Sequence, residues 1–154
     1  MNYKKIPKIL VLGEIYLIHD TFANHDLIRN LGYLGFEVLS TQKASELAKH
    51  IAFKHYYHWK MARITKPYLK VDVGGHAREN VMELLVESKK GIYGVIHVGP
   101  FGCMPEVTIN PILQNIAKKF NIPFMFLTFD VQTSDTGLLT RLEAFSDLIK
   151  RDGE

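Results

Sequence analysis

Cysteine is almost absent from the sequence, because Cys103 is the single thiol among 154 residues. One thiol excludes an internal disulfide, a cysteine-rich zinc site contained in this chain, and a conventional four-cysteine iron–sulfur site. A lone cysteine stays a thiol in the reducing cytosol, and we therefore predict a cytoplasmic protein.

Long apolar runs and a strong charge of either sign are also missing. No stretch approaches the roughly 18 uninterrupted apolar residues of a membrane span. The first apolar run, residues 9–13, is not followed by a signal-peptide cleavage site. The 19 basic and 16 acidic residues give a formal net charge of +3 and are spread along the chain. We therefore expect neither a membrane nor a nucleic acid as partner.

What remains is the composition of a globular protein, with 47% hydrophobic and 23% charged residues. A chain of this length holds one domain with its own core, and we expect residues 1–154 to form a single α/β domain. Short apolar runs alternate with longer segments of helical period, which is typical of βαβ units around a parallel sheet. The predicted strands are residues 9–18, 36–40, 93–98 and 123–129, and a short extended piece at 70–73 would make a fifth.

Helices are predicted between and after these strands, at residues 22–34, 43–64, 77–90, 106–119 and 138–151. The first follows an Asp20-Thr21 cap and ends at Gly35. A four-stranded parallel sheet, or a five-stranded one, with helices on both faces makes a three-layer sandwich of the flavodoxin-like or Rossmann-like kind. Ligands of such folds bind beyond the carboxyl ends of the strands, where the strand order reverses. The loops at 14–24, 98–106 and 129–137 are therefore the candidate site.

The loop at 98–106, with the sequence Val-Gly-Pro-Phe-Gly-Cys-Met-Pro-Glu, carries two glycines and two prolines around Cys103. These residues fix a backbone shape that a plain connection does not require. The thiol is expected at the carboxyl end of a strand and just before a helix, where the helix dipole and free N–H groups favour a thiolate. The alternative, a buried cysteine acting as a small hydrophobic residue, has equal weight on these grounds.

Other polar residues give weaker signals. Asp130 follows a predicted strand and is either a ligand-binding carboxylate or a turn residue. Gly74-Gly75 precedes a helix, but its spacing matches neither the dinucleotide fingerprint nor the P-loop, so we expect no ATP or NAD. His55 and His58 share a helix face without a third ligand at matching spacing, which makes a zinc site improbable.

The aromatic segment at 44–64 is apolar nearly all round, with two stripes along the predicted helix. Such a helix needs cover on more than one side, and we predict a homo-oligomer in which a second copy covers it. The alternative is a helix that lies across the sheet under residues 66–70.

Several strings together resemble the C-terminal cysteine-bearing domain of the 2-hydroxyacyl-CoA dehydratase family, most closely the related domain of large CoA-substrate-specific activase proteins. The likeness spans most of residues 9–151. The strings are Leu-Gly-Glu-Ile-Tyr at 12–16, His-Asp at 19–20 with Asn24, Val-Gly-Gly-His at 73–76, residues 94–106, Leu-Thr-Phe-Asp at 127–130 and Gly-Leu-Leu-Thr-Arg-Leu-Glu-Ala-Phe at 137–145.

The resemblance implies an iron–sulfur system. In this family an ATP-driven activase passes an electron to a dehydratase, a lyase whose [4Fe–4S] cluster is held by cysteines from separate domains. Cys103 matches the cysteine that the C-terminal domain contributes. The other residues on motif positions, which we take as candidates for the ligand crevice, are Gly13, Glu14, Asn24, Pro100, Phe101, Gly102 and Asp130.

The chain departs from the family because it lacks the domains that carry the other cluster cysteines and the nucleotide. We therefore predict an accessory component that is not catalytic alone, contributing Cys103 to a [4Fe–4S] cluster shared with a cysteine-bearing dehydratase or activase subunit, with no cofactor in the isolated chain. The alternatives are a non-catalytic binding or structural domain that acts through subunit or small-ligand binding, and a thiol-dependent enzyme, for which spacing identifies no general base.

Overall fold

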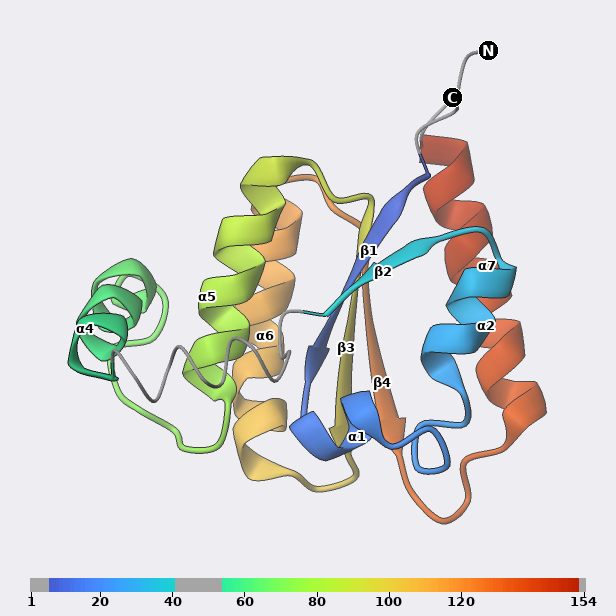
Figure 1. Cartoon of the computed structure of the whole chain (residues 1–154), viewed down its shortest axis with the longest axis horizontal. Helices are drawn as coiled ribbons and strands as arrows, with labels where there is room; N and C mark the ends of the chain where they lie inside the picture. Colours follow the sequence, from blue (N-terminus) through green and yellow to red (C-terminus); the bar gives the residue numbers. More distant parts are fainter. Residues whose placement is uncertain (1–5, 41–53, 153–154) are drawn as a thin grey trace.

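The computed structural model describes residues 6–40 and 54–152, with the side chains of residues 54–58 and 152 left aside. Its centre is a parallel sheet of four strands in the order β2-β1-β3-β4. The strands are β1 (Lys8–Gly13), β2 (Glu37–Leu39), β3 (Gly94–Pro100) and β4 (Phe124–Phe129). Helices cover both faces of the sheet (Figure 1). The predicted α/β three-layer sandwich of the flavodoxin-like kind is confirmed.

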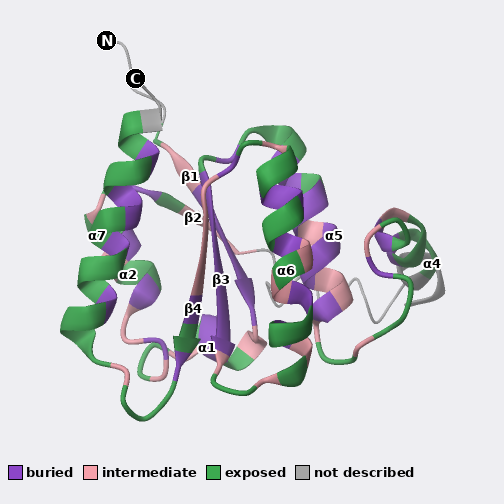
Figure 2. Cartoon of the chain, turned by 180° about the vertical axis from the view of Figure 1, so that it is seen from behind, coloured by how far each residue is buried: buried purple, intermediate pink, exposed green. Residues whose placement is uncertain are grey.

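The helices divide between the two faces. One face carries α1 (Ile15–His19), α2 (Leu27–Tyr33) and α7 (Asp135–Asp152), and the other carries α5 (Ala77–Glu87) and α6 (Met104–Lys119). A short 3₁₀ turn, Ser88–Lys90, extends α5. A further helix, α4 (Lys54–Thr65), packs against α5. Figure 2 shows the buried residues concentrated in the strands and on the inward sides of the helices.

Alternate residues of β1 enter two separate cores because successive side chains of a strand point to opposite faces. Ile9 and Val11 join the core under α1, α2 and α7, where Leu27, Leu142 and Phe145 are buried. Leu10 and Leu12 join the core under α5 and α6. These continuous apolar runs are those of strands buried on both faces, as the sequence predicts.

The strand register brings three carboxyl ends to the same edge of the sheet. Gly13 of β1 pairs with Val98 of β3, and Pro100 of β3 pairs with Phe129 of β4. The chain leaves β1 toward β2 on one side and later returns to β3 on the other side. The edge between β1 and β3 is therefore the point at which the strand order reverses, where ligands of this architecture bind.

The first strand is shorter than predicted, which corrects the expectation of a strand over residues 9–18. It ends at Gly13, whose φ of 138° is a conformation that side chains other than glycine rarely adopt. The chain then turns into α1. Asp20 does not cap a following helix either, because its Oδ1 accepts the N–H groups of Phe22 and Ala23 in a turn, and α2 begins only at Leu27.

Two further expectations change around α4. Residues 70–73 form no fifth strand: residues 70 and 71 bend, residues 72 and 73 are irregular, and Asp72 Oδ1 accepts the N–H of Gly74 in a local turn. The helix predicted at 43–64 is present over residues 54–65 and ends shortly before Pro67, as predicted, whereas 41–53 lie outside the described residues. α4 packs against α5, an arrangement different from the alternative in which it crosses the sheet. None of the helices in the described ranges is long and apolar enough to cross a membrane.

Candidate functional site

Cys103 lies at the reversal point of the sheet, in the tight turn that joins β3 to α6. Its N–H donates to Pro100 O at 3.1 Å, and the N–H of Phe101 donates to Phe129 O at 2.9 Å. Gly102 adopts φ of 77°, which lets the turn close. Since the turn is bonded both to itself and to the end of β4, its backbone is fixed at this edge.

Cys103 is also the N-cap residue of α6, a helix of 16 residues, and its carbonyl accepts the N–H of Val107 at 2.9 Å. The thiol is free and half-buried, and it makes no side-chain capping bond. The side chains on either side of it are open to solvent: Phe101 is 77% and Met104 74% exposed. The cysteine therefore sits at a helix N-terminus between two exposed apolar residues.

Gly13 is required by the close approach of β1 and β3. A Cβ atom on Gly13 would lie 1.8 Å from Val98 O, and the next residue, Glu14, donates its N–H to that same oxygen at 3.2 Å. Glu14 is half-buried at the start of α1 and makes no side-chain capping bond. The structure thus brings Gly13, Glu14 and Cys103 to the ends of two neighbouring strands.

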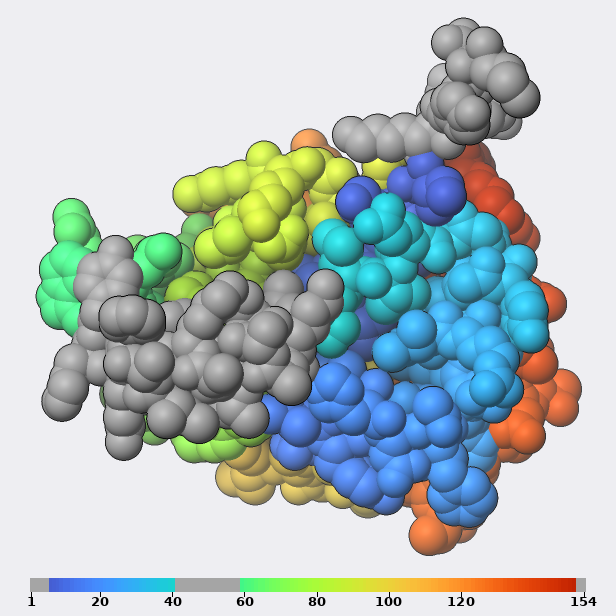
Figure 3. Space-filling view, in the orientation of Figure 1, coloured from blue at the N-terminus to red at the C-terminus, as the bar shows by residue number. Residues whose placement is uncertain are grey.

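Asn24 is a buried amide, 1% exposed, that organises the loop between α1 and α2. Its Nδ2 donates to Leu17 O at 2.7 Å, and its Oδ1 accepts the N–H of Leu27 at 3.1 Å. Both ends of the side chain are therefore engaged within the chain. Figure 3 shows the segment from α1 to α2, which Asn24 holds, covering this face of the molecule beside β2.

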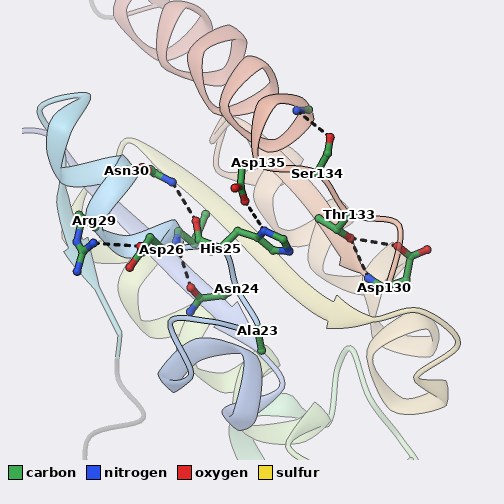
Figure 4. A network of polar contacts seen from close by, with 12 residues as sticks. Ala23, Asn24, His25, Asp26, Arg29, Asn30, Asp130, Thr133, Ser134 and Asp135 are labelled. Carbon is green, nitrogen blue, oxygen red and sulfur yellow. Dashed lines mark hydrogen bonds and ion pairs between the residues drawn. The ribbon is translucent and has the colours of Figure 1, made fainter.

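The same loop is tied to the start of α7 through His25. Its Nδ1 forms an ion pair with Asp135 (Figure 4). Its ring stacks on Phe129 with the centroids 6.2 Å apart. His25 and Asp26 both have positive φ, at 53° and 55°, so the loop turns sharply here. The ion pair joins the loops that follow β1 and β4.

Asp130 begins the loop after β4 and forms a turn of its own. Its Oδ1 accepts the N–H of Gln132 at 2.9 Å and the Thr133 hydroxyl at 3.2 Å, while Thr133 Oγ1 accepts the N–H of Asp130 (Figure 4). Asp130 also lines a pocket of about 260 Å³. Arg141, one side chain that the sequence analysis did not select, reaches this pocket from α7. No local signal in the sequence marks Arg141, because the pocket forms only when α7 packs beside the loop that begins at Asp130.

A buried polar network lies beneath the Cys103 turn, and the sequence analysis missed it. His97 on β3, Asn80 on α5 and Glu106 on α6 are each 0% exposed. His97 Nε2 lies 2.6 Å from Glu106 Oε2, and Asn80 Nδ2 donates to the same oxygen at 3.1 Å. A histidine inside an otherwise apolar strand was the available signal, because such a group needs a buried partner.

The described side chains do not complete an iron–sulfur or other metal site. Among the side chains that the structure describes, those of residues 6–40 and 59–151, no group of three or more His, Cys, Asp or Glu could hold a metal ion. Cys103 is the single cysteine of the sequence, whereas a [4Fe–4S] cluster is held by four ligands. This chain could therefore provide one ligand of such a cluster and no more from cysteine.

Comparison with known proteins adds no relative: no protein-family model matches the chain, and no curated protein matches it. The resemblance to the 2-hydroxyacyl-CoA dehydratase family thus stays a prediction from the sequence motifs.

Proposed function

We propose that this protein is an accessory subunit that contributes Cys103 as one thiolate ligand of an iron–sulfur site completed by a cysteine-bearing partner, in a system of the dehydratase or activase kind. The observation that supports this function is the place of Cys103. It is half-buried, free and at the N-terminus of α6, on the sheet edge where the strand order reverses.

The turn before α6 holds Cys103 at a defined position. The thiolate is the metal-binding form of cysteine, and the Cys103 side chain makes no capping bond that would compete with a ligand role. Because the turn is held by hydrogen bonds to Pro100 and Phe129, the sulfur has a fixed attachment point. A ligand held in place before binding loses less conformational entropy when it binds.

The surroundings of Cys103 suit a site completed from outside. Phe101 and Met104 are exposed on both sides of it, and large exposed apolar side chains gain free energy when a partner covers them. A partner docked there would cover both side chains and bring its cysteines to the sulfur. A bound cluster of this kind would supply one-electron transfer. In this proposal the chain alone acts neither as a dehydratase nor as an ATPase. A shared thiolate site of this kind belongs in a reducing compartment such as the cytosol.

The test is the iron content of the protein as cells assemble it. The tagged chain is expressed in the organism that encodes it and purified without oxygen, and iron, sulfide and absorbance near about 400 nm, where thiolate-ligated clusters absorb, are measured. We expect iron and sulfide with the wild type and their loss in Cys103→Ser, which keeps the size of the side chain. Thr108→Ser, on the exposed side of α6, is the matched control and should keep the iron. Iron-free wild type, or equal iron in Cys103→Ser, would overturn the proposal.

The pocket beside Asp130 supports a second candidate function, the binding of a small carboxylate. Within the described ranges neither Asp130 nor Arg141 takes part in an ion pair, although both line this pocket of about 260 Å³. An unpaired guanidinium suits a carboxylate because its N–H groups match the two oxygens. Calorimetric titration with acetate, glycolate and alanine would test it. Binding that is lost in Arg141→Gln supports the function, and no binding by the wild type excludes it for these ligands.

A further inference from the structure

The buried network of His97, Asn80 and Glu106 has no part in the proposed site, yet it lies directly beneath it. Its members come from three elements: β3, α5 and α6. Asn80 also exchanges two hydrogen bonds with the backbone of Gly13, at 3.3 Å each, which adds the end of β1. The network therefore joins the elements that meet at the reversal point of the sheet.

Every charged or polar group of this network has a partner. Glu106 Oε2 contacts both His97 and Asn80, and His97 Nδ1 lies 3.4 Å from Asn110 Oδ1. The His97 ring stacks on Phe126, with the centroids 4.7 Å apart. Burying such groups costs free energy unless their hydrogen bonds are made. The arrangement is therefore specific, and a substitution that removes Glu106 leaves His97 Nε2 buried without the carboxylate it contacts.

Glu106 connects this network to Cys103. It is the third residue of α6 after the capping residue Cys103, and its side chain turns into the core. The backbone approaches the same helical turn closely at two glycines. A Cβ on Gly99 of β3 would lie 3.1 Å from Glu106 Cβ, and a Cβ on Gly75 would lie 3.3 Å from Pro105, so neither position has room for a side chain unless the turn shifts. The first turn of α6 is thus held by β3, by α5 and by the loop before α5.

We propose that Glu106 is a positioning residue: held by His97 and Asn80, it fixes the first turn of α6 and thereby the direction in which Cys103 presents its sulfur. The inference rests on the proposed function for the use of that sulfur, but its geometry does not depend on iron. A network that stabilised only the core would leave the surroundings of the thiol unchanged when it is altered.

The test compares two reagents on the same thiol in the purified, reduced chain. Intact mass spectrometry measures the rates at which iodoacetamide and a bulky maleimide modify Cys103. The quantity compared between variants is the rate with the maleimide divided by the rate with iodoacetamide. Both reagents attack the thiolate, so the ratio cancels the thiolate fraction and reports the space around the sulfur. The chain unfolded in urea gives the ratio of an unrestricted thiol.

Three variants separate positioning from general stability. In Glu106→Ala we expect the ratio to rise at least about fivefold toward the unfolded value, the change that corresponds to about 1 kcal/mol. Glu106→Gln keeps an acceptor oxygen for His97 and Asn80, and its ratio should stay within about twofold of the wild type. Leu142→Ala, in the core on the opposite face, is the matched control for loss of stability and should leave the ratio unchanged.

Gly99→Ala keeps the inference testable if Glu106→Ala does not fold. It pushes on Glu106 without removing a polar group, and Gly32→Ala, where a Cβ meets nothing within 4 Å, is its control. An unchanged ratio in folded Glu106→Ala, or in Gly99→Ala when the former does not fold, would overturn the inference, as would an equal rise in Leu142→Ala. Because no iron is used, a chain that never binds iron would refute the proposed function while leaving this result intact.

Discussion

At the end of β1, Gly13 has a hydrogen atom where any other residue has a Cβ, and this allows the strand to lie against β3. Gly13 has φ of 138°, and a Cβ there would lie 1.8 Å from Val98 O, closer than any real contact. Backbone atoms cannot move aside as a flexible side chain can. The geometry of the whole carboxyl edge, including the turn of Cys103, therefore depends on this glycine.

Gly13→Ala is expected to lower the free energy of unfolding by about 3 kcal/mol, because the added methyl group meets backbone and the residue must keep a positive φ. Gly32→Ala provides the contrast. Gly32 lies in α2 with nothing within 4 Å of an added Cβ, so alanine should raise stability by up to about 1 kcal/mol. Urea denaturation followed by circular dichroism measures both. Equal stability of Gly13→Ala and wild type would contradict this account of β1.

At this scale the sequence shows some of the site and hides the rest. The position of Cys103 before a helix follows from an apolar strand, a Gly/Pro turn and a helical period, all of which are local signals. The pairing of His97 with Glu106 and Asn80 is not local, because it forms only when β3, α5 and α6 pack together. Arg141 was missed for the same reason, since its pocket is formed with the loop that begins at Asp130.

Among the elements, α6 carries the site and also contains a defect, Pro111. A proline inside a helix lacks the N–H that would donate to Val107 O, and its ring crowds that carbonyl. Pro111 is exposed, so nothing in the core requires it. The helix keeps its course through residue 119 despite this, because its buried side, with Ile109 and Leu113, is packed in the core.

Pro111→Ala should raise the free energy of unfolding by about 1 to 2 kcal/mol. The restored hydrogen bond and the relieved contact outweigh the greater freedom that alanine gives to the unfolded chain. Pro105→Ala in the first turn of the same helix is the control. No intrahelical bond is available to the N–H at that position, so the change there should stay below about 1 kcal/mol. Thermal and urea unfolding measure the stability of both variants. A lower free energy of unfolding in Pro111→Ala than in the wild type would contradict this prediction and show that the proline stabilises the helix.

Element prediction succeeded where the hydrophobic period was long and failed where it was short. The four strands and the long helices follow from runs of buried residues. The apolar run at 9–18 continues past Gly13, and the five residues of α1 are too few to display a helical period. The sequence therefore predicted one strand where the structure has a strand followed by a short helix. Residues 70–73 show the reverse error. Their short apolar alternation pairs with none of the four described strands, and the segment is a bend followed by irregular backbone.

For the molecule as a whole, the alternation of strands and helices was enough to predict the three-layer architecture. It could not predict partners, because these depend on surfaces that carry no period. One such surface is on α4, where Trp59 is 59% exposed and Arg63 lies over its ring at 5.5 Å. We retain the proposal that the segment at 44–64 associates with a second copy.

Sedimentation velocity over a range of concentrations tests this association. The wild type should show a mass that rises toward that of a dimer or larger oligomer, and Trp59→Glu should remain a monomer, because the change removes the apolar ring and adds a charged side chain that loses its hydration in a contact. Tyr33→Glu is the matched control, since Tyr33 is an aromatic residue 81% exposed on α2; its mass should follow the wild type. A wild type that stays monomeric at every concentration would contradict the proposal.

The central claim is that Cys103 serves as a ligand in a site shared with another chain. The most direct test measures whether the Cys103 sulfur in cell extract can be alkylated. Extract of the native organism is treated with iodoacetamide without oxygen, before and after the iron is removed by ferricyanide and a chelator; the second sample is treated with a phosphine reductant before iodoacetamide, so that thiols oxidised by ferricyanide are free again. Mass spectrometry then gives the modified fraction of Cys103. The account predicts protection at first and modification after iron removal, reaching the fraction found in denatured extract. Full modification of Cys103 while the iron is still present would contradict it.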